Sequence, residues 1–261
     1  MHKHRQTQVI MNLSYSSRRT VKNPWLYLTQ NTLSMKIGIL GYGEVGQAIA
    51  GLYESVVICD PFKGYDDDMN NLDLLNVCIP YSNTFVDVVS NKIHDIKPKH
   101  IVIHSTVPVG TTESIGANVT HSPVRGLHPN LLKGLKTFVK YIGGGDSQWY
   151  KGHLESIGVK VEVVKNSKTS ELAKIADTTY YGICIAFTSD MKKLCDEYDL
   201  DFVEVMTRYN ETYNEGYTKL DKSNVVRPVL HPTDQIGGHC VIPNAKFLPR
   251  TKLIDGLLDY E

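Results

Sequence analysis

The chain has 261 residues, which is enough for one large domain or two small ones. Its 28 Lys and Arg residues balance 28 Asp and Glu residues, and this zero formal charge argues against a general nucleic-acid binder, which usually carries a basic excess. Hydrophobic residues make up 41% of the chain, as expected for a folded protein, and no apolar run is long enough to span a bilayer, so we expect no membrane partner.

Residues 1–34 differ in kind from the rest of the chain. They contain Lys3, Arg5, Arg18, Arg19 and Lys22 but no Asp or Glu, which is the composition of an organelle transit peptide. They show no sustained amphipathic period, and Met35 opens the first recognisable strand. We therefore favour a basic N-terminal extension before a start at Met35, and we leave it out of the fold.

Residues 35–165 alternate between strand and helix patterns. Short apolar runs with β-branched residues predict strands at 35–40, 55–60, 74–80, 100–105, 118–122, 137–144 and 159–164. Helical spacing occurs at 47–53, 83–96 and 146–156, and the acidic stretch 66–73 is interpreted as a solvated connection. This alternation predicts an α/β fold, a doubly wound Rossmann-type parallel sheet covered by helices on both faces.

Residues 166–261 change to a helical pattern. Ser167, Thr169 and Ser170 offer oxygens for an N-cap, and apolar residues then recur at helical spacing from Leu172 as far as Leu194. A second helix is expected within 200–220, and one or two short helices close the chain after Cys240. These residues predict a smaller, all-helical second domain.

The stretch GYGEVG at 41–46 is a G-x-G-x-x-G motif. It follows a strand, opens a helix and precedes a second strand that ends in Asp60, which is the context that a dinucleotide site requires. Asp60 can bond both ribose hydroxyls and would repel a 2′-phosphate, so we expect NAD rather than NADP as the cofactor. Lys63 lies close enough to weaken that preference.

Four motifs together carry a resemblance to a known family. They are the glycine loop with Asp60, STVPVGTT at 105–112, ELAKIADTTYYGICIAF at 171–187 and GGHCVIPNAKFL at 237–248. Their order and spacing resemble the UDP-glucose/GDP-mannose dehydrogenase family, which oxidises a sugar-nucleotide alcohol to a carboxylate through a cysteine thiohemiacetal and thioester. The resemblance implies a small-molecule substrate and a homodimer formed along the long helix. It also implies a C-terminal nucleotide-binding domain that this chain lacks, so we expect a truncated relative.

The resemblance assigns roles to individual residues. Cys240 would be the nucleophile, Lys174 would stabilise the oxyanion, and Thr106 would lie beside the nicotinamide. The cofactor-binding residues would be Gly41, Tyr42, Gly43, Glu44, Val45, Gly46, Asp60, Pro80 and Thr106. The residues expected to contact the substrate are Glu171, Arg125, His128 and Asn244.

Three positions depart from the pattern of that family. Val124 stands where the family usually has a glutamate, Thr178 where it has an asparagine, and Asn244 where it has an aspartate. The two carboxylates help to activate water for thioester hydrolysis, whereas valine accepts no proton and an amide is a far weaker base. The first oxidation therefore looks feasible, and the final hydrolysis lacks its usual groups.

Other interpretations stay open beside this one. Residues 122–146 also resemble β-hydroxyacid dehydrogenases, in which Lys174 or His128 would be the base of a two-electron oxidation and Cys240 would be a loop residue. A third alternative is a non-catalytic NAD-binding module. The histidines and Cys240 fit no recognised metal-ligand spacing, so we expect no metal. Five scattered cysteines favour a reducing compartment, and we expect a cytoplasmic protein.

Overall fold

The computed structural model describes residues 35–236 and 240–261. Residues 1–34, interpreted as an N-terminal extension, and residues 237–239, the start of the GGHCVIPNAKFL motif, lie outside the described residues. In the part of the chain that the structure describes, no helix is both long and apolar enough to cross a membrane.

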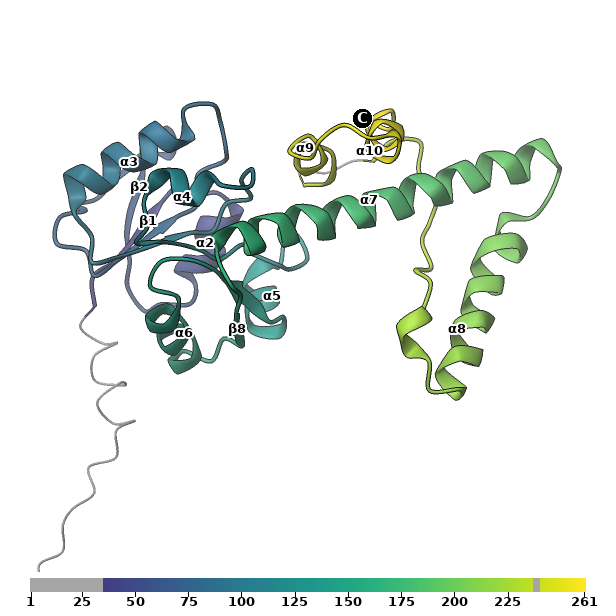
Figure 1. Cartoon of the computed structure of the whole chain (residues 1–261), viewed down its shortest axis with the longest axis horizontal. Helices are drawn as coiled ribbons and strands as arrows, with labels where there is room; N and C mark the ends of the chain where they lie inside the picture. The colour runs from purple at the N-terminus through teal and green to yellow at the C-terminus, as the bar shows by residue number, and fades with distance from the viewer. Residues whose placement is uncertain (1–34, 237–239) are drawn as a thin grey trace, which may run out of the picture. The chain divides into compact units, whose positions relative to one another are not determined.

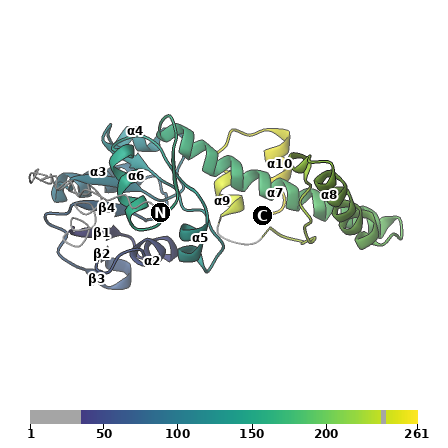
Figure 2. The same ribbon diagram turned by 90° about the horizontal axis from the view of Figure 1, so that it is seen from below.

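A six-stranded sheet confirms the predicted α/β fold (Figures 1 and 2). Its strand order is β3-β2-β1-β4-β5-β6, and every pairing is parallel except that of β3 with β2. The strands are β1 (Ile37–Leu40), β2 (Val57–Asp60), β3 (Tyr65–Asp66), β4 (Leu74–Val77), β5 (His100–Ile103) and β6 (Val119–His121). β1 lies at the centre, so the glycine loop that follows it emerges between two neighbouring strands.

Helices cover both faces of this sheet (Figure 1). Side chains of α3 and α4 pack with Leu40, Leu75 and Ile103 on one face, whereas α2, α5 and α6 cover Ile39 and Leu74 on the other. Successive strand residues therefore bury on opposite faces, as a sheet covered on both sides requires. The helices are α2 (Glu44–Ala50), α3 (Phe85–Ile96), α4 (Thr111–Ile115), α5 (Leu131–Thr137) and α6 (Ser147–Ser156).

The last two predicted strands do not join the main sheet. β7 (Lys140–Ile142) and β8 (Val161–Val163) pair with each other in a separate parallel sheet, linked to β6 by one antiparallel bridge between His121 and Gly143. The chain turns sharply at Gly144 and Gly145, both of which have positive φ. Such a turn interrupts the alternation of strands and helices, from which the sequence pattern alone predicts a single sheet.

The acidic stretch 66–73 is more than the solvated connection that we expected. Met69 and Leu72 are buried in the core under α3, and a Cβ atom on Gly38 would lie 2.3 Å from Leu72 Cδ1. The side chain of Asp73 accepts a hydrogen bond from the backbone N–H of Lys36 at 2.8 Å. Two apolar residues among the acids therefore anchor this loop.

The second part of the chain is helical, as predicted. The long helix α7 (Ser167–Glu197) is capped by Asn166, whose side chain accepts from the backbone N–H of Thr169, and not by the serines and threonine that we expected. Short helices near the C-terminus lie against α7 (Figure 1). The remaining helices are the π-helix η2 (Val203–Arg208), α8 (Tyr209–Lys219), α9 (Val241–Ala245) and α10 (Lys252–Leu258), with short 3-10 turns η1 (Pro61–Lys63) and η3 (Ser223–Val225).

Candidate active site

The glycine loop between β1 and α2 has no room for larger residues at two positions. A Cβ atom on Gly46 would lie 2.0 Å from the carbonyl oxygen of Gly41, and Gly41 itself has a φ of +90°. Gly43 is the opposite case, because a Cβ there would meet nothing within 4 Å. The backbone at Gly43 is therefore open to the close approach of a ligand, as dinucleotide binding requires.

Asp60 and Lys63 are both tied to this loop. The carboxylate of Asp60 accepts from the backbone N–H of Tyr42 at 2.8 Å, and the Lys63 amine donates to the carbonyl of Tyr42 at 2.9 Å. The second carboxylate oxygen of Asp60 is the acceptor expected for a ribose hydroxyl. Together with the open backbone at Gly43, these residues fit an NAD cofactor, whereas Lys63 is engaged with the loop itself.

The STVPVGTT stretch is held in place by Glu171. The Glu171 side chain is fully buried, and its two oxygens accept from the backbone N–H groups of Gly110 and Thr112 at 2.6 and 2.9 Å. We expected Glu171 to contact substrate; in the structure its carboxylate is bonded to the backbone at the start of α4. Thr106 is half-buried in the same stretch, next to Ser105, whose hydroxyl donates to the Ile79 carbonyl at 2.5 Å.

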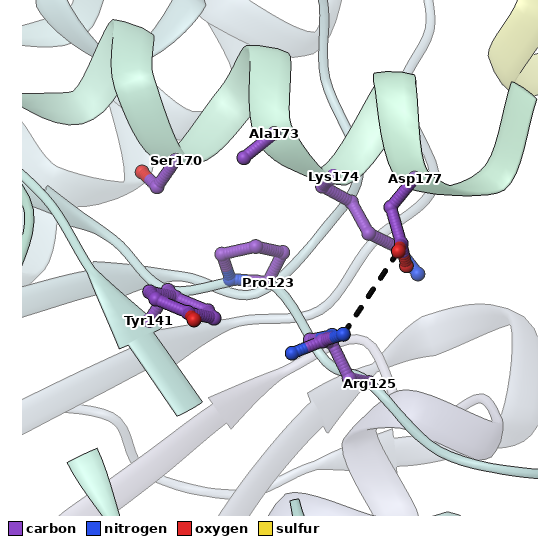
Figure 3. Close-up of a pocket in the computed structure, with 7 residues that line it drawn as sticks. All are labelled: Pro123, Arg125, Tyr141, Ser170, Ala173, Lys174 and Asp177. Atoms are coloured by element: carbon purple, nitrogen blue, oxygen red, sulfur yellow. Dashed lines mark ion pairs between the residues drawn. The ribbon is translucent and has the colours of Figure 1, made fainter. Parts of the chain in front are cut away.

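A small cavity of about 230 Å³ lies beside the first turns of α7 (Figure 3). Arg125 and Lys174 extend toward Asp177, and the Arg125 guanidinium lies 3.9 Å from the Asp177 carboxylate and 5.6 Å from the centre of the Tyr141 ring. The lining residues are Pro123, Arg125, Tyr141, Ser170, Ala173, Lys174 and Asp177. Two cations beside one carboxylate leave the cavity suited to an anionic group.

Lys174 is partly withdrawn from solvent. Burial lowers the pKa of Lys174 from its ordinary value, the charges of Cys240 and Asp177 act in the opposite direction, and Arg125 adds to the lowering. Lys174 is thus half-buried in the wall of the cavity. A lysine amine that is partly withdrawn from solvent can move protons or stabilise an oxyanion.

Cys240 lies at the N-cap of α9, which packs on α7. A Cβ on Gly182 of α7 would lie 2.3 Å from Val241 Cγ1, and the Asn244 side chain donates to the Thr178 hydroxyl at 3.1 Å. Two residues that depart from the family pattern, Thr178 and Asn244, are therefore in contact with each other. Their hydrogen bond fixes the helix that carries Cys240.

The loop of His128 connects Cys240 to the glycine loop. The Cys240 sulfur lies 3.5 Å from His128 Nε2, and His128 Nδ1 forms a hydrogen bond with the carboxylate of Glu44. The imidazole of His128 therefore links the Cys240 thiol to Glu44 of the glycine motif. Within residues 35–236 and 240–261, no three His, Cys, Asp or Glu side chains are placed to hold a metal ion.

The remaining candidate residues lie around the same loops. Val124 is buried in an apolar cluster with Ile39 and Leu131, so it offers no polar atom to the cavity. Tyr42 and Val45 are half-buried, whereas Glu44 and Pro80 are exposed.

Lys140 is a buried cation that our sequence reasoning missed. Its amine donates to the carbonyls of Ser122 and Pro123 at 2.6 and 3.2 Å, and burial lowers its pKa to about 7. Pro123 also lines the cavity, so Lys140 lies directly behind the cavity wall. The only signal in the sequence was a lysine within an otherwise apolar strand.

A parallel sheet, a glycine turn after its first strand and an acid after its second define the fold class as a Rossmann-type dinucleotide-binding fold. Comparisons with known proteins agree with this class and narrow it. Residues 168–253 match the UDP-glucose/GDP-mannose dehydrogenase family, central domain, which confirms the resemblance seen in the sequence.

Curated relatives carry the name UDP-N-acetyl-D-mannosamine dehydrogenase. The chain is 24% identical to one from Campylobacter jejuni, over 74% of this chain and 48% of that protein. It is 27% identical to one from Methanococcus vannielii, over 79% of this chain and 49% of that protein. The chain therefore spans about half the length of the curated relatives that it matches.

Solved structures support the fold alone, because their sequences are less than a fifth identical. The UDP-D-ManNAc dehydrogenase from Pyrococcus horikoshii matches with a TM-score of 0.70 and 17% identity, over 87% of this chain and 68% of that one. The 3-hydroxyisobutyrate dehydrogenase from Mycobacterium tuberculosis matches with a TM-score of 0.62 and 15% identity, over 86% and 91%.

Proposed function

We propose that this chain is an NAD-dependent dehydrogenase that oxidises a hydroxyl of an anionic substrate, a sugar nucleotide, through a cysteine thiohemiacetal and thioester. Residues 35–165 hold the dinucleotide, and residues 166–261 carry the substrate-binding and dimerisation helices. The resemblance to nucleotide-sugar dehydrogenases supports the class of substrate.

The observation that carries this proposal is the packing of α9, which begins at Cys240, on α7, which carries Lys174. Asn244 of α9 is bonded to Thr178 of α7, one turn from Lys174, the charge of Cys240 raises the pKa of Lys174, and Lys174 and Arg125 line the same cavity. A thiol on the helix that packs against α7, and an amine and an anion-binding arginine that line one cavity, are the groups that this chemistry needs.

Each residue has a defined task in the proposed reaction. Two NAD molecules, bound in turn, would accept the hydrides of the two oxidations, from alcohol to aldehyde and from the cysteine thiohemiacetal to the thioester. Cys240 attacks the aldehyde carbon that the first oxidation leaves, and the resulting oxyanion takes its proton from, or is neutralised by, Lys174. Arg125 binds an anionic group of the substrate, and Asp60 with the open backbone at Gly43 would hold the cofactor.

A two-electron dehydrogenase is the second candidate, and two observations favour it. Val124 is buried among apolar residues and the amide of Asn244 is bonded to Thr178, so neither replaces the carboxylates used for hydrolysis. The fold likeness to 3-hydroxyisobutyrate dehydrogenase also extends over nearly all of that protein. In this reading Lys174 or His128 is the base, and Cys240 has no covalent role.

We also infer a homodimer formed along α7. Large apolar side chains of this helix are exposed to solvent, and a second copy would cover them. They include Leu172, Tyr180, Tyr181, Phe187 and Leu194. All five cysteines lie in the described residues and none is bonded to another, which is consistent with our proposal of a cytoplasmic location.

The test is the number of NADH molecules formed per substrate consumed. UDP-N-acetyl-D-mannosamine, from the name of the relatives, is the first substrate to use. We expect two NADH per substrate and a thioester adduct on Cys240 that mass spectrometry detects. Cys240→Ser should form at most one NADH and no adduct, whereas Cys184→Ser, on the half-buried cysteine of α7, should behave as the wild type.

Other stoichiometries decide between the candidates. One NADH per substrate with no adduct in the wild type would support the two-electron reaction. Two NADH per substrate from Cys240→Ser would contradict the covalent role of this cysteine.

A further inference from the structure

Three side chains outside the cavity form a continuous hydrogen-bonded row. Cys240 at the start of α9 contacts His128, in the loop after β6, and His128 contacts Glu44, the first residue of α2. The two contacts join residues 112 and 84 positions apart in the chain. Folding therefore assembles this row, and no local sequence motif contains it.

The order of the three groups determines what the imidazole can do. The Glu44 carboxylate is an acceptor, so it holds the His128 proton on Nδ1. Nε2 is then left as the unprotonated nitrogen, and it faces the Cys240 sulfur at 3.5 Å. A carboxylate that fixes the tautomer of a histidine directed at a nucleophile is the arrangement of nucleophile, base and orienting acid known from hydrolases.

This row supplies a function that the site otherwise lacks. Hydrolysis of a thioester on Cys240 needs a base to activate water, and neither Val124 nor the engaged amide of Asn244 can serve. The His128 and Glu44 side chains are 43% and 55% exposed, and an open groove of about 700 Å³ lined by Glu44 and Pro129 lies beside them. Water therefore has access to the imidazole.

We propose that Cys240, His128 and Glu44 act as a catalytic triad in which His128 is the base for both formation of the thiolate and hydrolysis of the thioester. The inference rests on the proposed function for the origin of the thioester. In the first step, the Cys240 proton moves to His128 Nε2, and the sulfur attacks the carbonyl carbon. The exposed His128 then releases this proton to bulk water, so that Nε2 is again a free base before the hydrolytic step.

In the hydrolytic step, His128 Nε2 takes a proton from water as the oxygen bonds to the acyl carbon. The carbon–sulfur bond then breaks, and the sulfur leaves with the proton held by His128. A thioester and one water become a carboxylic acid and the free thiol, with no change in oxidation state. His128 touches the reacting sulfur, whereas Glu44 acts through His128 and is a positioning residue.

The experiment uses p-nitrophenyl acetate without NAD or a sugar nucleotide, so that it does not depend on the oxidation. Attack by Cys240 releases p-nitrophenolate and leaves an acetyl thioester, whose formation and loss can be followed by mass spectrometry. We expect one acetyl group per wild-type chain, on Cys240, and no acetyl group on Cys240→Ala.

His128→Gln should lower the rates of acetylation and deacetylation by about 10²-fold each, the usual contribution of a general base. The matched control is His94→Gln, on an 84% exposed histidine of α3 that also pairs with a carboxylate, and it should keep wild-type rates. Added imidazole should restore part of both rates in His128→Ala, which distinguishes a lost base from a disturbed fold.

Glu44→Gln should lower the same two rates about tenfold, since it leaves the base in place but no longer fixes its tautomer. Glu44→Asp should recover part of the loss, and added imidazole should not rescue Glu44→Gln. Unchanged rates in Glu44→Gln would remove Glu44 from the proposal.

Three results would overturn the triad itself: no acetylation of wild-type Cys240, wild-type rates in His128→Gln, or no rescue of His128→Ala by imidazole. A working triad in a chain that forms no NADH with any sugar nucleotide would refute the proposed function and leave the triad standing. NADH formation from a sugar nucleotide, with acetylation and deacetylation unchanged in His128→Gln, would support the proposed function and refute the triad.

Discussion

The two tightest glycine contacts of the sheet region, residues 35–163, are with backbone atoms, at Gly46 and Gly143. The described glycines of the helical region, residues 167–236 and 240–261, face side chains or have nothing within 4 Å. A Cβ on Gly46 or Gly143 would lie within 2.2 Å of a carbonyl oxygen. Gly182 of α7 instead faces Val241 and Leu257 side chains, and Gly216 and Gly256 have nothing within 4 Å.

Burial differs in the same way. Most of the large fully buried side chains, such as Ile39, Tyr150 and Leu154, belong to the sheet region, with Ile175 and Leu257 as examples from the helical region. Helices α7, η2 and α8 expose many large apolar residues. The dinucleotide turn is thus set at Gly46 by backbone packing that leaves no room for a side chain. The position of Cys240 depends instead on side-chain packing between α7 and α9. In the proposed site, backbone contacts therefore fix the glycine loop that would bind the cofactor. Side-chain contacts, which tolerate substitution better, position Cys240.

The largest contrast should come from adding one methyl group to each region. Gly46→Ala forces the glycine loop away from the Gly41 carbonyl, and we expect a loss of about 3 kcal/mol in the free energy of unfolding. Gly216→Ala, in open space on α8, should instead gain about 0.5–1 kcal/mol, because alanine is the better helix former. Urea unfolding of both variants measures the difference, and equal effects would remove the distinction between the regions.

The next contrast concerns the buried charge of Lys140 in the sheet region. Its pKa is about 7 in the folded chain and near the ordinary lysine value of 10.5 when unfolded, so the unfolded state binds more protons between these values. The free energy of unfolding should therefore rise with pH, by at most about 1.4 kcal/mol per pH unit above pH 7. Below pH 7 both states are protonated and the cost of the buried ammonium is constant.

Unfolding between pH 7 and 9 is the measurement, because above pH 9 the buried thiol of Cys78 works in the opposite direction. Burial raises the pKa of Cys78 to about 12, so its contribution to stability falls as the unfolded thiol ionises. Lys140→Met should abolish the rise between pH 7 and 9. Lys252→Met, on an exposed lysine of the helical region, should keep it. A rise that survives Lys140→Met would mean that another group causes it.

The contrast between local patterns and contacts of distant segments also explains what could be predicted from the sequence. The central strands and the glycine turn depend on local patterns of apolar residues and glycines, and they lie where expected. The helices α4 and α5 were missed because they are short, and the start of α4 is held by Glu171, about sixty residues away in the chain. No local pattern could separate β7 and β8 from the main sheet.

In the candidate site, too, single residues could be predicted from the sequence but their arrangement could not. The family resemblance nominated Cys240, Lys174 and Arg125 as separate residues, but their arrangement is a matter of tertiary structure. Nothing in the sequence indicates that His128 lies between Cys240 and Glu44, since this requires three distant segments to meet. Lys140 escaped notice because a strand lysine is usually exposed, and only the fold reveals its burial.

The smallest predicted effect tests the side-chain contact that positions the nucleophile. Asn244 donates to the Thr178 hydroxyl, which itself donates to backbone carbonyls of α7, so the two side chains fasten α9 to α7. In a double-mutant cycle of Thr178→Val and Asn244→Ala, we expect a coupling energy of about 1 kcal/mol in urea unfolding. A cycle of Thr218→Val, on an exposed threonine of α8, with Asn244→Ala should show none.

Thr178 and Asn244 stand where the family has an asparagine and an aspartate. A coupling between them would mean that the two changes together keep Cys240 in position while removing a carboxylate. A coupling near zero would mean that apolar contacts, such as that of Val241 with Gly182, hold α9 without this hydrogen bond, and the paired departures would then have no common structural reason.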